Sequence, residues 1–239
     1  MATDEADDLL RKAEVVPYGV LGSQLGARGV TMRGSDPAKS EGPPIVIVDP
    51  AGLHHVQPPG GPCGAGGAAG VIYSWLGIGD DESFPNPVIA SVRSTGDAKL
   101  HMYSNQHLVI HAVGPDLRVE DCDAKGAVAR LSRAYSNILR QFATAGIADG
   151  AVLRLLPVSG GIFSGEFQPR LPILTFQALR KALREVLVSE PAVRAALLAP
   201  RCRVEMCIFL EDEFAPFVRA QRTVGAGYEL RARGTKRKL

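Results

Sequence analysis

The stretch PIVIVDPAG (residues 44–52) precedes GGPCGAGGAAGVIYSWLG (residues 60–77), and together they predict a buried strand, a glycine-rich loop and a helix. A continuous β-branched run is typical of a strand covered on both faces, as in parallel sheets. Glycine is used where the backbone turns left-handed or lies against a ligand. SGGIFSGEF (residues 159–167) is a second such loop. Because N–H groups at a helix N-terminus or in a loop attract anions, the two loops predict a phosphate-binding site.

The rest of the chain alternates apolar strands with amphipathic helices. Further strands are expected at residues 107–113, 151–158 and 204–210, and ARGVTMR (residues 27–33) is a weaker strand candidate. Helices are expected at residues 124–145 and 172–188, where apolar residues recur every three or four positions, and in a shorter acidic segment from residue 211 to about residue 219. This alternation predicts an α/β fold, a three-layer α/β/α sandwich in which the strands at 45–49, 107–113, 151–157 and 203–210 are adjacent in one mostly parallel sheet.

Composition narrows the class of protein. The 239 residues include 46% hydrophobic and 22% charged residues, with a net charge of +2, which indicates an ordinary globular protein without a global nucleic-acid signature. No run of 18 apolar residues occurs, the acidic N-terminus is unlike a leader peptide, and the four cysteines lack metal or disulfide spacing. We therefore expect no membrane span, no bound metal and an intracellular location, cytoplasmic or nuclear. The basic end GTKRKL (residues 234–239) is interpreted as a solvated tail or, alternatively, as a nuclear-import or RNA-contacting segment.

Three kinds of glycine loop were compared. A Walker loop requires Gly-Lys-Ser/Thr, and no lysine occurs between Lys39 and Lys99, which excludes it. A dinucleotide fingerprint is formally present at Gly64, Gly66 and Ala69, but it begins about fifteen residues after its strand, so it fits poorly.

The third kind rests on several segments in order: IVIVDPAG, GAGGAAGVIYSWLG, TGDAKLHMYSNQHLVIHAVGP and LRLLPVSGGIFSGEF. Their order resembles the macro domain family, which binds ADP-ribose, and the resemblance spans residues 29–217. VIHAVGP (residues 109–115) matches the family intact. In the second loop, the residues that match are Ser159, Gly161, Ile162, Phe163 and, after an extra Ser164, Gly165. The resemblance implies a mixed, mostly parallel sheet of about six strands.

The resemblance also implies which residues contact the ligand. The first loop would lie along the distal ribose and diphosphate, and the second would close over the diphosphate, with Phe163 beside the ribose or simply in the core. Asp36 is interpreted either as an acceptor for the adenine amino group or as a turn residue, and Phe209 as bordering adenine or as core. The predicted ligand-binding residues are Asp36, Asp49, Ala51, Gly52, Gly66, Gly67, Ala68, Ala69, Gly70, Ser159, Gly160, Gly161, Ile162, Phe163, Gly165 and Phe209.

Two departures from the family concern catalysis. The family's Asn-Ala-Ala-Asn segment reads Asp49-Pro50-Ala51-Gly52 here, and an aspartate that often positions water is replaced by Ala69. Hydrolysis needs water held in line and its developing charge stabilised, which neither Gly52 nor Ala69 can do through a side chain. The remaining candidate catalytic residues are Asp49, His54 and His55. His111 is interpreted as a core histidine with its partners satisfied, and Tyr73 as structural.

Three functions follow from this reading. The first is recognition of ADP-ribose or an ADP-ribosylated protein with weak or no hydrolase activity. The second is an active hydrolase, on ADP-ribosylated protein or a small ADP-ribose derivative, that uses divergent residues. The third is a drifted pocket that serves protein or RNA contacts, with nucleic acid less favoured as a partner. No cofactor is expected. The predicted organisation is an N-terminal extension with a short helix (1–27), a macro-like domain (28–220) and a basic tail (221–239).

Overall fold

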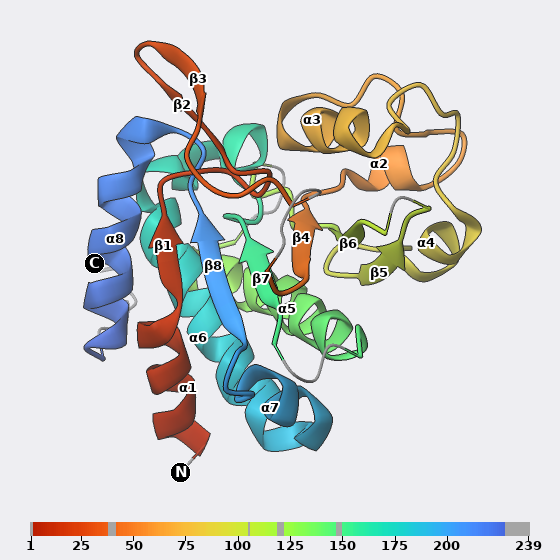
Figure 1. The fold of residues 1–239 in the computed structure, drawn as a ribbon. Helices are drawn as coiled ribbons and strands as arrows, with labels where there is room; N and C mark the ends of the chain where they lie inside the picture. The colour runs from red at the N-terminus through yellow and green to blue at the C-terminus, as the bar shows by residue number, and fades with distance from the viewer. Residues whose placement is uncertain (1, 38–41, 105, 119–121, 147–149, 228–239) are drawn as a thin grey trace, which may run out of the picture.

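The computed structural model describes residues 2–37, 42–104, 106–118, 122–146 and 150–227 (Figure 1). Its centre is a six-stranded sheet in the order β1-β8-β7-β4-β6-β5. Only β5 runs antiparallel to its neighbour, so the predicted mixed, mostly parallel sheet is confirmed, as is the adjacency of its four predicted strands. The strands are β1 (Glu14–Val16), β4 (Ile45–Asp49), β5 (Ala98–Met102), β6 (Leu108–Ala112), β7 (Val152–Leu155) and β8 (Arg203–Cys207).

Helices cover both faces of the sheet, which makes three layers (Figure 1). One face packs against the long helices α5 and α6 together with α1, α7 and α8, and their apolar side chains form the larger core cluster. The other face is covered by short helices, α2, α3 and α4, and by loops, around a smaller cluster. The helices are α1 (Ala2–Lys12), α2 (Leu53–Val56), α3 (Gly67–Leu76), α4 (Asn86–Ser91), α5 (Ala124–Ala143), α6 (Leu171–Ser189), α7 (Pro191–Leu197) and α8 (Glu211–Gly225), with 3-10 turns η1 (Gly161–Phe163) and η2 (Gly165–Arg170).

Helix ends follow the sequence signals. Gly77 ends α3 and takes the left-handed φ of 75° at its C-cap, where a side chain would be strained. Asp123 caps α5 by accepting a hydrogen bond from the N–H of Gly126, 2.8 Å away. Helix α8 extends beyond its predicted end near residue 219, to Gly225, because Ala220 and Val224 are buried on its core side.

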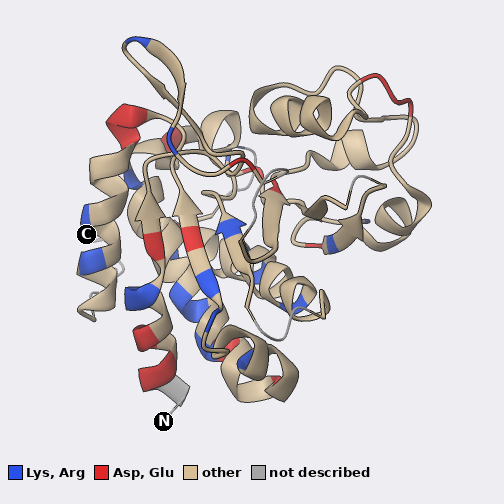
Figure 2. Cartoon of the chain, viewed as in Figure 1, with Lys and Arg blue, Asp and Glu red and all other residues tan. Residues whose placement is uncertain are grey.

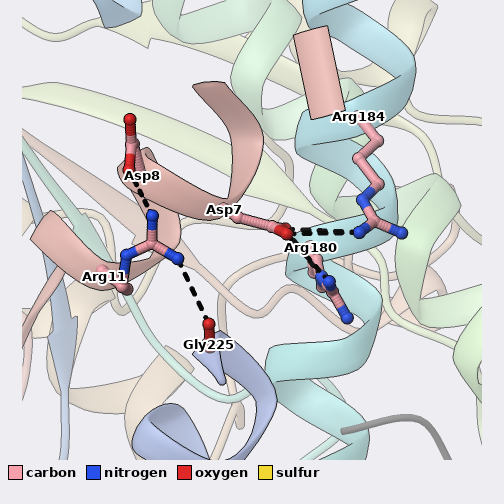
Figure 3. Close-up of polar contacts among 6 residues, drawn as sticks. All are labelled: Asp7, Asp8, Arg11, Arg180, Arg184 and Gly225. Carbon is pink, nitrogen blue, oxygen red and sulfur yellow. Dashed lines mark hydrogen bonds and ion pairs between the residues drawn. The ribbon is translucent and has the colours of Figure 1, made fainter. Parts of the chain in front are cut away.

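The first 27 residues are built into the same sheet and core. Strand β1 pairs with β8, and α1 buries Ala6 and Leu10. Asp7 of α1 accepts hydrogen bonds from Arg180 and Arg184 of α6 (Figure 3). The short helix expected in the N-terminal extension is present as α1, and the boundaries drawn at residues 27 and 220 stay predictions.

Three regions differ from the sequence expectations or lie outside them. The predicted strand at 27–33 becomes β3 (Gly29–Met32), which pairs with β2 (Ser23–Gly26) in a hairpin outside the main sheet. The edge strands β1 and β5 were not predicted, because β1 has three residues of which only Val16 is buried, and β5 has no buried residue. The basic end at 234–239 lies outside the described residues. Within the described residues, no helix combines the length and apolarity that a bilayer span requires.

Candidate functional site

The site is built at the edge of the sheet where the parallel strands end. Strand β4 leads into α2 and the first glycine loop, and its neighbour β7 leads into the second. Because β4 and β7 are parallel, both loops emerge at the same edge, beside α3 (Figure 1). In open α/β sheets, ligands bind at this carboxyl edge.

Asp49, at the end of β4, is completely buried. Its Oδ2 accepts hydrogen bonds from the Tyr73 hydroxyl at 2.9 Å and from His111 Nδ1 at 2.7 Å. The Tyr103 hydroxyl lies 2.8 Å from the other ring nitrogen, Nε2 of His111. The three contacts fit a His111 tautomer whose Nδ1–H donates to Asp49 while Nε2 accepts from the Tyr103 hydroxyl. Both interpretations of the sequence, His111 as a core histidine and Tyr73 as structural, fit this network.

The buried network raises the pKa of the two tyrosine hydroxyls that belong to it. Burial first, and the Asp49 carboxylate second, raise the pKa of Tyr73 and the pKa of Tyr103 above the ordinary tyrosine value. These hydroxyls therefore stay protonated and remain donors. The Oδ1 atom of Asp49 is buried without a hydrogen-bond partner in the structure. The predicted catalytic candidate Asp49 is thus a buried acceptor beneath the Pro50-Ala51-Gly52 segment rather than a surface carboxylate.

Gly52 and the two histidines form one contact. A Cβ placed on Gly52 would lie 2.8 Å from Cε1 of His54 and 3.3 Å from Cδ2 of His55, so the imidazoles occupy the room that a side chain at 52 would take. His54 is exposed, and burial first, then His55, lowers its pKa. His55 Nδ1 lies 3.0 Å from the carbonyl of Gly61, which orients this ring toward the following loop. Ala51 is buried beside them.

The first loop ends at the N-terminus of α3. Gly66, its N-cap, makes no side-chain capping bond, so the first N–H groups of the helix have no partner within it. A Cβ on Gly66 or on Gly67, which has φ of 59°, would meet nothing within 4 Å, so the backbone here faces open space. Gly70 differs, because a Cβ there would lie 2.2 Å from the carbonyl of Ala65. Ala68 is exposed, whereas Ala69 is buried.

The second loop is held by backbone contacts and reaches outward. Ser159 has φ of 61° and is buried, and its hydroxyl donates to the carbonyl of Pro115 at 2.5 Å. Gly161 has φ of 60°, and a Cβ there would meet nothing within 4 Å. Ile162 beside it is 72% exposed. The Leu117 N–H donates to the carbonyl of Phe163 at 2.9 Å, which ties this loop to the loop after β6.

The remaining predicted residues of this loop have distinct surroundings. The guanidinium of Arg118 lies 5.1 Å from the centroid of the half-buried Phe163 ring. Arg118 is also paired with Asp116, whose pKa the guanidinium lowers through a hydrogen bond. A Cβ on Gly165 would lie 3.1 Å from Cγ of Arg118, and the N–H of Gly160 donates to the carbonyl of Pro157.

Asp36 and Phe209 lie at the β7–β8 side of the same edge. Phe209, 39% exposed, follows β8, and a Cβ on Gly19 would lie 3.3 Å from its ring. The Gly22 N–H donates to the carbonyl of Gly19, and a Cβ on Gly22 would lie 2.8 Å from the carbonyl of Ser35, the neighbour of Asp36. The turn at residues 19–22 thus lies between Phe209 and the segment that carries Asp36, the two residues predicted to contact the adenine base.

The site has few cations of its own. The segment from residue 42 to residue 92 contains no Lys or Arg, and Figure 2 shows α2, α3 and α4 without blue. Among the described residues, no group of three or more His, Cys, Asp or Glu side chains is arranged to hold a metal ion. An anion at the first loop would therefore be held by backbone N–H groups.

Sequence reasoning missed Tyr18, Tyr103 and Arg154, which hold the site together. Tyr103 lies outside any predicted strand. Arg154 interrupts the apolar run of β7, which was a visible signal, because a buried arginine requires partners. Its partners come from residues far away in the chain and could not be assigned from sequence.

No protein-family model matches the sequence, and no curated protein does. Solved structures do match. The Oceanobacillus iheyensis macrodomain with ADP is 16% identical over 83% of this chain and 91% of its own, with a TM-score of 0.53. The same macrodomain with MES bound is 14% identical over 81% and 90%, with a TM-score of 0.51. A point mutant of it with ADPR is 14% identical over 78% and 88%, with a TM-score of 0.50. The chain therefore has the macrodomain fold.

Proposed function

We propose that this chain, which has the macrodomain fold, binds ADP-ribose or an ADP-ribosylated protein through its two glycine loops. The structurally similar Oceanobacillus iheyensis protein is described with ADP and, as a mutant, with ADPR. Fold likeness alone does not establish function, so the proposal depends on the site. The observation that carries it is the pair Gly67 and Gly161, both left-handed and both facing open space, in the two loops that follow the neighbouring strands β4 and β7.

This pair of loops suits a diphosphate. A diphosphate offers many acceptor oxygens, and the α3 N-terminus and the second loop offer N–H donors without a side chain in the way. The distal ribose then lies toward Ala51, Gly52 and the histidines, with Phe163 of the second loop beside it. The base lies toward Asp36 and Phe209. Asp49 supports this arrangement from below, by holding the end of β4 to α3 through Tyr73.

Calorimetric titration with ADP-ribose, beside AMP and NAD, tests the binding. Gly161→Glu brings a side chain and a negative charge into the open space, so we expect affinity for ADP-ribose to fall by at least about a hundredfold. Gly146→Glu is the matched control, since Gly146 has φ of 67°, faces open space and follows α5 at the opposite edge of the sheet. Gly161→Ala isolates the backbone strain. Unchanged affinity of folded Gly161→Glu would refute the loop assignment.

Turnover is expected to be slow or absent. Gly52 and Ala69 offer no side-chain hydrogen bond, and Asp49 is buried and already engaged. Losing a water-positioning group is expected to lower the rate of hydrolysis on the order of 10²–10⁴-fold, the factor ascribed to a single acid–base group. The test is release of ADP-ribose from an automodified acceptor at enzyme excess, measured beside a macrodomain hydrolase.

A restoring variant sharpens that test. Gly52→Asn with Ala69→Asp returns both side chains, and we expect it to raise the rate. Because the His54 ring occupies the room beside Gly52, His54→Ala should be combined with the pair. His54→Ala alone is the matched control. A rate that stays flat in the folded triple variant would contradict the explanation based on positions 52 and 69.

The active-hydrolase alternative is supported by one observation. His54 has a lowered pKa and is exposed beside Gly52, so near neutral pH its ring is neutral and able to accept a proton. Brisk release of ADP-ribose by the unmodified chain would favour this function. Single substitutions of Asp49, His54 and His55 would then identify the group responsible. Absence of any ADP-ribose binding would instead favour the protein- or RNA-contact alternative.

A further inference from the structure

Arg154 is a fully buried charged side chain that the proposed binding does not use directly. It lies on β7, in the middle of the sheet, and only 2% of its side chain is exposed. Its Nε donates to Oε2 of Glu205 on the neighbouring strand β8, at 2.9 Å. Tyr18 covers the pair, with its ring centroid 5.2 Å from the guanidinium carbon and its hydroxyl 3.3 Å from Glu205. Burial first, then the Glu205 charge, raises the pKa of Tyr18 to about 12, so this hydroxyl remains a donor.

The other end of the guanidinium holds two loops. Nη1 donates to the carbonyl of Val20 at 3.0 Å and to the carbonyl of Ser35 at 2.9 Å. Nη2 donates to the Ser35 hydroxyl at 2.9 Å. The planar guanidinium of Arg154 thus connects the centre of the sheet to two segments that are distant from it in sequence. A lysine could not reproduce this, because its ammonium is a single point charge on a flexible stem.

Other contacts at these loops differ in kind: Val20 is buried in the smaller core cluster, whereas the Ser35 segment is joined to the Val20 loop by the Gly34 N–H, which donates to the carbonyl of Gly22. Residues 34–36 are Gly, Ser and Asp, which supply no apolar side chain to the core. Gly34 lies against the Tyr18 ring, since a Cβ there would be 2.8 Å from it. A buried ion pair is a poor source of net stability, and apolar replacements are often neutral or stabilising. The pair is better explained by what it positions than by the free energy of folding that it contributes.

The segments that Arg154 holds lie at the end of the site that the proposed function assigns to the nucleotide base. The Val20 segment carries Gly19, which contacts Phe209, and Ser35 precedes Asp36. Phe209 is a partly exposed ring, and Asp36 follows Ser35, on two segments that both meet the residues 19–22 turn. An aromatic ring and a carboxylate suit a planar heterocycle that bears an amino group, since the ring stacks and the carboxylate accepts. Resting on the proposed function, we propose that Arg154 is a positioning residue that sets base selectivity, by holding the residues 19–22 turn and the Ser35–Asp36 segment in register with Phe209.

The test removes the pair without leaving a buried charge alone. Arg154→Met with Glu205→Leu should fold with unchanged or higher thermal stability. Its amides at residues 19–22 and 33–37 should exchange hydrogen about tenfold faster. Its dissociation constant for ADP-ribose should rise about tenfold, and its preference for ADP-ribose over the hypoxanthine analogue, which has a carbonyl in place of the amino group, should fall toward one. Arg154→Lys should show the same loss of preference.

Controls separate positioning from general stability. Arg180→Met with Asp7→Leu removes a different, partly buried ion pair on the opposite face, together with the Arg184 contact to Asp7, and should leave affinity and base preference unchanged. Ser35→Ala deletes one of the Arg154 bonds without touching the core, and should weaken binding by about threefold, the size of one modest hydrogen bond. This variant keeps the test available if the double variant fails to fold.

The outcomes are distinguishable. If the unmodified chain binds ADP-ribose, and the folded Arg154→Met/Glu205→Leu variant binds it with the same affinity and base preference, the positioning role is wrong while the proposed function stands. If the unmodified chain binds no ADP-ribose, the proposed function fails and the base-selectivity role fails with it. Reduced preference together with faster exchange in the two loops supports both.

Discussion

On one face of the sheet, the inward side chains of β4, β6 and β7 are apolar, as in Val46, Val48, Ile110, Leu153 and Leu155, and all are buried under long helices. The other face mixes buried apolar residues of the smaller core cluster, such as Ile47 and Val109, with charged and polar side chains on the same strands and on their neighbour β8. There Asp49, His111, Arg154 and Glu205 are buried as well, under short helices and loops. The same strands thus have two faces of different chemistry.

The two faces differ in what their contacts do: one mainly stabilises the fold, and the other also positions the loops of the proposed binding site. Apolar contacts on the helical face are non-directional and roughly proportional to the area buried. Hydrogen-bonded groups on the other face are directional, and each places one loop relative to the sheet: Asp49 joins β4 to α3, and Arg154 joins β7 to the loops at residues 20 and 35. We expect substitutions on the first face to change stability mainly and those on the second to change ligand binding as well.

The largest effect is expected at Phe176, a fully buried residue of α6 that packs edge-on against Phe217. Phe176→Ala should lower the free energy of unfolding by about 3–5 kcal/mol, through lost burial and the cavity left behind. Urea denaturation measures this, and ADP-ribose affinity of the remaining folded protein should be unchanged. Val188→Ala, at a 71% exposed position near the end of the same helix, should change stability by less than about 0.5 kcal/mol. Equal losses for the two variants would contradict the assignment of the core.

A smaller effect is expected at Asp49 on the polar face. Asp49→Ala leaves the Tyr73 hydroxyl and His111 Nδ1–H without their acceptor, and should cost about 2–4 kcal/mol, since each unpaired buried donor costs about 1–3 kcal/mol. Asp49→Asn keeps one acceptor oxygen and should cost about half as much. Thermal unfolding gives the stability, and titration with ADP-ribose should show weakened binding for both variants. A stability loss with wholly unaltered binding would break the comparison between the two faces.

A pH-dependent effect of about 1 kcal/mol is expected where α1 meets α6. The hydrogen bond from Arg180 first lowers the pKa of Asp7 below its ordinary value of 3.8. Because the folded-state pKa is depressed, this stabilisation is present above pH 3.8 and is lost as pH falls through the lower folded value. Asp7→Asn should therefore destabilise by about 1 kcal/mol at pH 7 and converge with the unmodified chain in acid. A difference that persists unchanged at pH 2 would exclude the ion pair as the cause.

The smallest effect is expected in the β2–β3 hairpin, which lies on neither face. Val30 is 63% exposed and Met32 is 60% exposed, so Val30→Ser with Met32→Ser should change the free energy of unfolding by less than about 0.5 kcal/mol. ADP-ribose affinity should also be unchanged. Loss of either property would show that the hairpin contacts something these residues need for folding or binding.

Sequence patterns predicted the central strands and long helices because burial on both faces leaves continuous apolar runs and one-sided burial leaves a helical period. They failed at the edge strands β1 and β5, which are short and lack a continuous buried apolar run. The strand predicted at residues 27–33 is present as β3, and its pairing with β2 was not predicted. Within the site, the loops of glycines were predictable because left-handed backbone requires glycine. The burial of Asp49 could not be predicted, because the sequence pattern of an aspartate at the end of a strand is the same whether its carboxylate faces a ligand or a tyrosine hydroxyl.

By itself the sequence determined that this chain forms an α/β sandwich with two glycine loops at one edge of its sheet. Only the tertiary structure decided that Asp49 is a buried acceptor, that His54 takes the room beside Gly52, and that Arg154 holds residues 20 and 35. The physical reason is the separation along the chain between the residues that interact. Periodicity and glycine content act over a few neighbouring residues, whereas hydrogen-bond partners 62 or 134 positions apart meet only once the sheet is assembled.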